Sequence, residues 1–273
     1  HHCVIDSVKQ RMLSRRDLFK GAAAVAGAAA LATTFTPRPL FAQQTSPQRA
    51  EDLTHELHEG FPTFDGNQQF FMEPKFKIDK DGYNLNYWRL EEHCGTHIDA
   101  PLHFSADGRS VSELEVGELV CPLVVIDIRA KAAESADAQL TPEDIDAWVA
   151  TNGEIPAGAC VAMLSGWSEK VTGDEFRNAD ESGTMHFPGF HVEATNKLLE
   201  EGRAGAIAVD TLSLDFGQSP DFAVHYSWLP AGKYGIECIA NLDKLPASGA
   251  TLVVGAPKIR NATGGPARVF ALV

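Results

Sequence analysis

Residues 93–103, HCGTHIDAPLH, place three imidazoles and a carboxylate within eleven positions, with a glycine and a proline between them. One such histidine would be an ordinary surface or core residue, but packing does not explain three of them beside an aspartate. Neutral imidazole and ionised carboxylate are good ligands for divalent first-row metals. Three protein ligands with one open position are typical of hydrolytic metal sites. The segment therefore predicts a metal site that activates water.

The spacing of these side chains does not suit a regular helix or strand. On a helix His93 and His97 would share a face, but Gly95 lowers helix propensity and Pro101 disfavours the α region before it. On a straight strand the two histidines would be about 13 Å apart, at roughly 3.3 Å per residue, which is too far to share an ion. We therefore expect a strand that bends at Gly95, where a positive φ is cheap, and stops at Pro101. The bend would gather His93, His97 and Asp99.

The segment matches every fixed position of H-x-G-T-H-x-D-x-P-x-H, and it resembles the cyclase-like metal hydrolases, which include bacterial kynurenine formamidases and isatin hydrolases. Further landmarks resemble the same family, so the similarity runs from about residue 51 to the C-terminus. They are the opening segment 52–64, Phe187-Pro188-Gly189, segment 210–215, and His225 followed by Glu237.

The resemblance implies roles for individual residues. Asp99 would bridge two ions in members with two metals, and His103, beyond the proline, would donate and accept protons. The implied metal ligands are His93, His97, Asp99, His225 and Glu237, and the implied catalytic residues are His103 and Glu237. Zn²⁺ is the expected cofactor, with one or two ions. Mn²⁺ is the alternative, because some members hold a single manganese ion.

Apolar runs and helix caps predict a mixed α/β domain. Segments 121–128, 159–164, 204–209, 250–254 and 268–273 read as strands. One helix is expected to begin after Thr141, with Pro142 at its first position, and another to run from His191 to Glu201 and end at Gly202. Alternating strands and helices favour helices packed on a sheet. The resemblance implies a swivelling β/β/α domain with a partly open barrel.

The first 42 residues read as a leader. Residues 14–20, SRRDLFK, precede an apolar run at 21–35, and Leu40-Phe41-Ala42 offers a cleavage site. This pattern is typical of a twin-arginine signal. The apolar run is short for a membrane anchor, which needs about 20 residues. We expect an exported, periplasmic or extracellular protein with one domain at residues 43–273.

The charge of the chain limits its partners. Its formal net charge is −14, and the leader removes six basic but only two acidic residues. Such an acidic mature surface repels nucleic acid and anionic membranes. The expected partner is a small-molecule substrate, and the resemblance implies a homodimer or homotetramer. Cys94 and Cys238 flank implied site residues, and we expect them to be buried packing residues rather than nucleophiles.

The expected reaction is hydrolysis of a non-peptide amide, either a linear N-formyl arylamine or a cyclic amide, by metal-activated water. Phe64 and Phe61 are the expected walls for a flat substrate, with Trp88 or Trp228 as further candidates. A lactone hydrolase, a metal-dependent lyase or dehydratase, and a non-catalytic small-molecule receptor remain as alternatives.

Two further polar or glycine-rich segments are expected to be turns without a catalytic role. Asp210 and Asp215 are expected to cap a turn after a strand, and residues 264–266 to form a turn.

Overall fold

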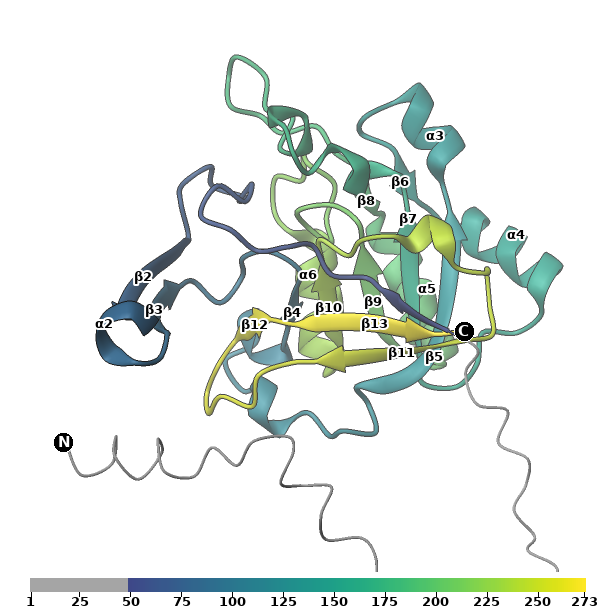
Figure 1. Ribbon diagram of the computed structural model, residues 1–273. Coiled ribbons are helices and arrows are strands. Elements are labelled where there is room, and N and C mark those ends of the chain that lie inside the picture. The colour runs from purple at the N-terminus through teal and green to yellow at the C-terminus, as the bar shows by residue number, and fades with distance from the viewer. Residues whose placement is uncertain (1–48) are drawn as a thin grey trace, which may run out of the picture. The chain divides into compact units, whose positions relative to one another are not determined.

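Four apolar segments form the parallel centre of a nine-stranded sheet in the computed structural model, which describes residues 49–273 (Figure 1). They are β5 (Val120–Asp127), β7 (Ala159–Leu164), β9 (Ala204–Val209) and β10 (Tyr234–Glu237). Parallel strands are usually buried on both faces, which explains their continuous apolar sequence. The strands predicted at 121–128, 159–164 and 204–209 are confirmed.

Antiparallel strands flank this centre on both sides. One side carries β11 (Ala250–Gly255), β13 (Arg268–Leu272) and β1 (Ala50–Asp52), and the other carries β4 (His97–Asp99) and β12 (Gly264–Pro266). The strand order is β1-β13-β11-β5-β7-β9-β10-β4-β12. The turn predicted at residues 264–266 is wrong, because the backbone there pairs with β4 as an edge strand. Pro266 is tolerated at this edge because one side of the strand needs no donor.

The sheet curls into a half-barrel with a separate core on each face. Leu123 and Val125 of β5 lie in the inner core, whereas Val124 and Ile126, which alternate with them, lie in the outer core, as strand alternation requires. The inner core also contains Ile98 of β4 and Val269 of β13, and these two strands lie near opposite edges of the sheet. The sheet must therefore bend around this core, which confirms the partly open barrel.

Three helices cover the outer face: α4 (Pro142–Asn152), α5 (Val192–Glu201) and α6 (Ala223–Trp228). Both helices predicted from caps are confirmed. Thr141 and Asp144 form a capping box at the start of α4. His191 precedes α5, and Gly202 ends it in the left-handed conformation. The outer core is filled by residues such as Trp148, Leu198 and Trp228.

The remaining elements are short. They are α3 (Arg129–Glu134), the paired strands β6 (Gln139–Leu140) and β8 (Gly189–Phe190), and the 3₁₀ helices η1 (Pro101–His103), η2 (Val111–Glu113), η3 (Trp167–Lys170), η4 (Asp174–Phe176), η5 (Leu229–Ala231) and η6 (Leu242–Lys244). No helix among residues 49–273 has the length and apolarity to cross a membrane. The predicted twin-arginine leader at 1–42 lies outside the described residues.

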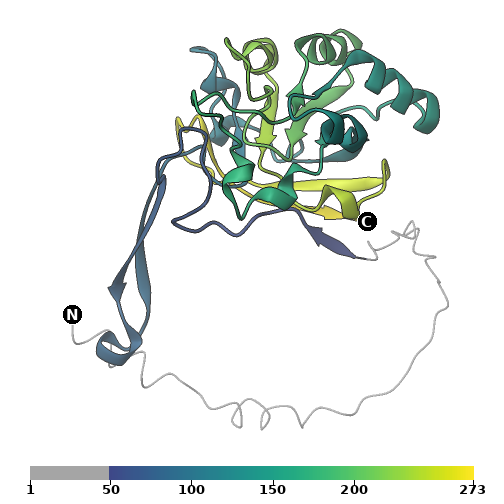
Figure 2. The same ribbon diagram turned by 90° about the horizontal axis from the view of Figure 1, so that it is seen from above.

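A hairpin projects from the sheet domain, and we call residues 70–90 the arm (Figure 2). It consists of β2 (Phe70–Phe76), α2 (Ile78–Asp81) and β3 (Leu85–Leu90), and β2 pairs only with β3. Every residue of β3 is exposed. The arm begins directly after Gln69 and ends directly before Glu91, whose backbone N–H donates to the Gln69 carbonyl.

Candidate metal centre and substrate pocket

Residues 93–103 bend as predicted. Gly95 has a φ of +68°, and a Cβ there would lie 3.0 Å from the Leu57 side chain, so both conformation and space favour glycine. The strand itself, β4, begins only at His97 and ends at Asp99, so His93 lies before the bend. Pro101 then starts the 3₁₀ helix that ends with His103. This path brings the side chains of His93 and His103, at the two ends of the segment, close to one another.

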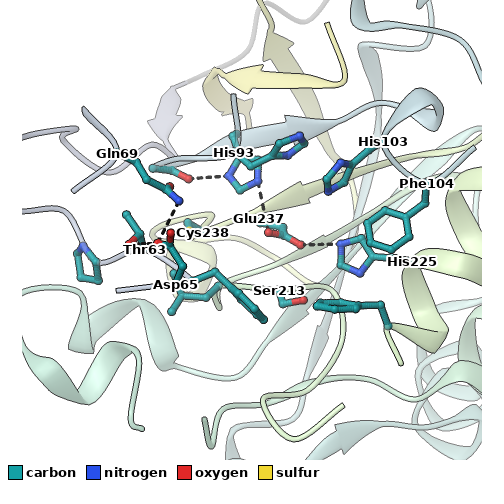
Figure 3. Close-up of a pocket in the computed structure, with 16 residues that line it drawn as sticks. Thr63, Asp65, Gln69, His93, His103, Phe104, Ser213, His225, Glu237 and Cys238 are labelled. Atoms are coloured by element: carbon teal, nitrogen blue, oxygen red, sulfur yellow. Dashed lines mark hydrogen bonds and ion pairs between the residues drawn. The ribbon is translucent and has the colours of Figure 1, made fainter. Parts of the chain in front are cut away.

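The neighbouring strand and α6 complete the cluster. In the antiparallel pair β10–β4, Glu237 is the register partner of His97. Strand pairing therefore places their side chains side by side. His225 approaches from α6. The structure thus brings together all of the predicted polar site residues: His93, His97, Asp99, His103, His225 and Glu237. Figure 3 shows four of them, His93, His103, His225 and Glu237, around the pocket.

Asp99 faces three imidazoles of the cluster, and Glu237 faces two. Asp99 Oδ1 lies 2.6 Å from His93 Nδ1 and 3.2 Å from His97 Nε2, whereas Asp99 Oδ2 lies 3.8 Å from His225 Nε2. Glu237 Oε2 lies 3.3 Å from His97 Nε2, and Glu237 Oε1 lies 3.2 Å from His225 Nε2. Each carboxylate therefore has one oxygen near His97 and the other oxygen nearer to His225.

Hydrogen bonds at the outer nitrogens set the directions of two rings. His97 Nδ1 is 2.8 Å from the Gly95 carbonyl, to which it donates. His225 Nδ1 is 2.6 Å from Asp215 Oδ2, and Asp215 also accepts from the backbone N–H groups of Val224 and His225. Both rings therefore turn Nε2 toward the carboxylates, and in the neutral form of the ring this nitrogen carries the lone pair that can bind a metal ion. Such outer partners are the usual means of orienting metal-ligating histidines.

The cluster is electrostatically coupled. Burial disfavours the charged form of His97, but the Asp99 and Glu237 carboxylates outweigh it and raise its pKa well above the ordinary value. For His225, burial is likewise outweighed by Asp215, Glu237 and Asp99, which raise the pKa to about 10. Burial opposes ionisation of Asp99, but the adjacent imidazoles hold its pKa well below the ordinary value. The carboxylates thus strongly favour positive charge at the cluster.

The residues fit a divalent cation. His97 Nε2 and Asp99 Oδ2 are buried and have no hydrogen-bond partner. The contacts of His97 Nε2 with the two carboxylates are close but do not form hydrogen bonds, and His225 Nε2 lies 3.8 Å from Asp99 Oδ2. Buried polar atoms are rarely left unpaired in a protein. Ligand atoms of His97, Asp99 and Glu237 lie within 4.8 Å of one another, as do those of His93, Asp99 and His103. Mixed imidazole and carboxylate donors suit Zn²⁺ and Mn²⁺.

A pocket of about 280 Å³ opens over the cluster. Three aromatic side chains from separate segments line it: Phe64, Phe104 and Phe222. The Phe64 and Phe222 ring centroids are 5.8 Å apart, and so are those of Phe104 and Phe222. Phe222 adopts a positive φ of 53°, an unusual conformation for an aromatic residue, directly before α6. The walls are therefore apolar and the floor is polar, as in sites for flat organic molecules.

The structure places the other predicted wall residues elsewhere. Phe61 is not on this pocket wall, because it is buried in a separate cluster with Phe176 and Trp167. Trp88 lies on the exposed arm, and Trp228, the last residue of α6, is fully buried in the outer core. Sequence reasoning missed Phe104 and Phe222, although both had a signal: Phe104 directly follows His103, and Phe222 precedes His225 by one helical turn.

The remaining candidates have structural roles. Cys94 and Cys238 are buried free thiols whose pKa is raised by burial, as expected for packing residues. Asp210 and Asp215 do accept from backbone N–H groups, but on other segments than their own turn: Asp210 accepts from Gly166 and Trp167, and Asp215 accepts from Val224. His191 accepts from the Glu193 N–H at the start of α5.

Comparison with known proteins agrees with this geometry. The Cyclase family model matches residues 51–216. The chain belongs to the Cyclase family. It is 40% identical over 210 residues to isatin hydrolase of Roseibium aggregatum, covering 72% of this chain and 78% of that protein. It is 25% identical over 219 residues to kynurenine formamidase of Salinibacter ruber, covering 80% of this chain and 94% of that protein.

A solved structure of the Cyclase family fits the fold closely. Isatin hydrolase A from Labrenzia aggregata, bound to benzyl benzoate, superposes with a TM-score of 0.78 at 40% identity, covering 82% of this chain and 93% of that one. The chain is therefore an amide hydrolase homologous to isatin hydrolase and kynurenine formamidase, and its curled half-barrel is the fold of the isatin hydrolase structures.

Proposed function

We propose that this Cyclase family protein hydrolyses a cyclic amide fused to an aromatic ring, of the isatin type, with divalent cations held by His93, His97, Asp99, His225 and Glu237. The buried, unpartnered His97 Nε2 and Asp99 Oδ2 beneath an aromatic pocket carry this proposal. The greater identity to isatin hydrolase than to kynurenine formamidase favours a ring amide over a linear N-formyl amide.

The cation would activate the carbonyl and the water, and His103 would transfer the protons. When bound, Zn²⁺ or Mn²⁺ polarises the amide carbonyl and lowers the pKa of a water molecule. Burial lowers the pKa of His103 to about 4, so its imidazole is neutral at pH 7 and can accept the proton of the attacking water. The same ring then returns a proton to the departing nitrogen. Phe64, Phe104 and Phe222 hold a flat substrate over the cluster and exclude water.

The two-sided arrangement of the carboxylates favours two cations, which the metal content of the purified protein tests. We expect about two equivalents of metal in the wild type and about one in His225→Ala. His225 lies near Asp99 Oδ2 and Glu237 Oε1, whereas His97 lies near the other oxygen of each carboxylate. Elemental mass spectrometry gives both numbers, together with the identity of the metal. One equivalent in both proteins would instead support a mononuclear site.

The predicted oligomer has a structural candidate in the arm. Met72, Ile78, Tyr83, Leu85, Tyr87, Trp88 and Leu90 of the arm are exposed large apolar residues. An isolated two-stranded hairpin is marginally stable, and a patch of this kind marks an interaction surface. The arm carries four basic and three acidic residues, in a chain of net charge −14. We propose that it packs on the acidic body of a second copy, which forms a reciprocal homodimer.

Light scattering after size exclusion tests the arm contact. We expect a dimer for the wild type and a monomer for the double variant Tyr87→Ser/Trp88→Ser, because the two exposed rings would no longer bury apolar surface. Ile259→Ser is the matched control, since Ile259 is exposed and apolar but lies outside the arm. A monomeric wild type, or a dimeric double variant, would contradict the proposal.

A further inference from the structure

His93 is held by a residue far away in the chain. It precedes the bend and belongs to no strand. Its Nδ1 lies 2.6 Å from Asp99 Oδ1, and its Nε2 lies 2.9 Å from the Oγ1 hydroxyl oxygen of Thr263, 170 residues later. Thr263 directly precedes the edge strand β12, which pairs with β4. The start of the edge strand therefore places the Thr263 hydroxyl next to Nε2 of the His93 ring.

Glu92 decides the direction of that hydrogen bond. Glu92 Oε2 accepts from the Thr263 backbone N–H at 2.9 Å, and it also accepts from the Thr263 hydroxyl. Because an ionised carboxylate only accepts, the single hydroxyl proton of Thr263 points to Glu92. The oxygen of Thr263 must then accept from His93 Nε2–H. This relay places a proton on His93 Nε2 and leaves Nδ1 facing Asp99 Oδ1, where a bound cation would replace the hydrogen between the two atoms.

Two close neighbours also restrict the His93 ring. The His103 ring stacks on it with centroids 3.8 Å apart and an interplanar angle of 21°. On another side, a Cβ at Gly264 would lie 2.4 Å from His93 Cε1, so the β12 backbone touches the ring. The imidazole can therefore neither tilt nor flip without moving the edge strand.

We propose that Thr263 and Glu92 are positioning residues that set the affinity of the metal ion bound by His93 through Nδ1. The inference rests on the proposed metal site. It assigns a function to a pair of residues that touch neither the ion nor the substrate. His97 and His225 use Nε2 and are held by Gly95 and Asp215, so His93 differs from them in both the ligating nitrogen and the supporting group.

Metal affinity of substituted proteins tests the relay. The probe is Co²⁺, titrated into metal-free protein in competition with a chelator. Thr263→Val keeps the shape of the side chain but removes the acceptor, and we expect it to weaken the tightest Co²⁺ site by about 10- to 100-fold. Thr263→Ser keeps the hydroxyl, and we expect it to bind Co²⁺ within about 3-fold of wild type. Glu92→Ala should weaken binding in the same direction as Thr263→Val.

Two further readouts separate positioning from general damage. The visible absorption spectrum of bound Co²⁺ reports ligand geometry, and we expect it to change in Thr263→Val but not in Thr263→Ser. Thermal unfolding of the metal-free proteins should give similar midpoints for the two variants. Equal affinities for wild type and Thr263→Val would overturn the relay and leave the metal site standing. Equal weakening in both Thr263 variants would also overturn it. A wild type that binds no Co²⁺ would overturn the proposed function as well.

Discussion

Replacing His103 with alanine is expected to lower kcat/KM for isatin hydrolysis by about 100- to 10,000-fold while the metal content stays unchanged. His103 is neutral at pH 7 because burial lowers its pKa to about 4, and it lines the pocket over the cluster. Without it, no nearby imidazole is free to move the proton, because His93, His97 and His225 face the two carboxylates. Steady-state kinetics and elemental analysis of the same preparation measure both quantities.

A matched histidine controls the His103 experiment. His191→Ala removes an imidazole that only caps α5, and it should leave kcat/KM unchanged. The His103 result is informative in a second way, because ligand atoms of His93, Asp99 and His103 lie within 4.8 Å of one another. If His103→Ala loses a metal equivalent together with activity, His103 is a ligand and the assignment as proton carrier is wrong.

Replacing Asp99 with alanine is expected to remove both the bound metal and at least about 10³-fold of kcat/KM, since a catalytic metal contributes several kcal/mol. Asp99 is fully buried, and its two oxygens face His93, His97 and His225. It is the carboxylate of the cluster that faces three imidazoles, whereas Glu237 faces two. Its loss should therefore affect every cation position, whereas His225→Ala should affect only one.

A carboxylate at the pocket rim gives the comparison for Asp99. Asp65 lines the same pocket, but its hydrogen-bond partners, Thr63, Asn67 and Gln69, belong to its own loop. Asp65→Ala should therefore keep the full metal content. Full metal content in Asp99→Ala, with more than a tenth of wild-type activity, would remove Asp99 from the metal site.

Local signals in the sequence predicted the central part of the fold. The strands at 121–128 and 159–164 have continuous β-branched and apolar runs, and α4 has a threonine cap followed by proline. The bend at Gly95 followed from the need to bring His93 and His97 together. These features depend on residues within one turn or one strand, which is why the sequence alone was enough.

Contacts between distant segments were beyond such reasoning. Thr263 reaches His93 across 170 residues, and Asp215 reaches His225 from a different loop. The arm was missed because most of its residues are exposed, so its sequence shows no alternation of buried and exposed positions. Phe61 was assigned to the pocket by position in its segment, but the loop turns its ring toward Phe176 instead.

The pairing of β4 with β10 has a consequence for how the protein is handled. His97 and Glu237 are register partners in a sheet whose backbone hydrogen bonds and apolar cores need no ion. The ligands are therefore assembled by the polypeptide before any cation arrives, in contrast to small domains that fold only around their metal. Protein from which the metal has been removed with a chelator should thus stay folded and bind metal again. Zn²⁺, Mn²⁺ and Co²⁺ can then be compared in the same protein.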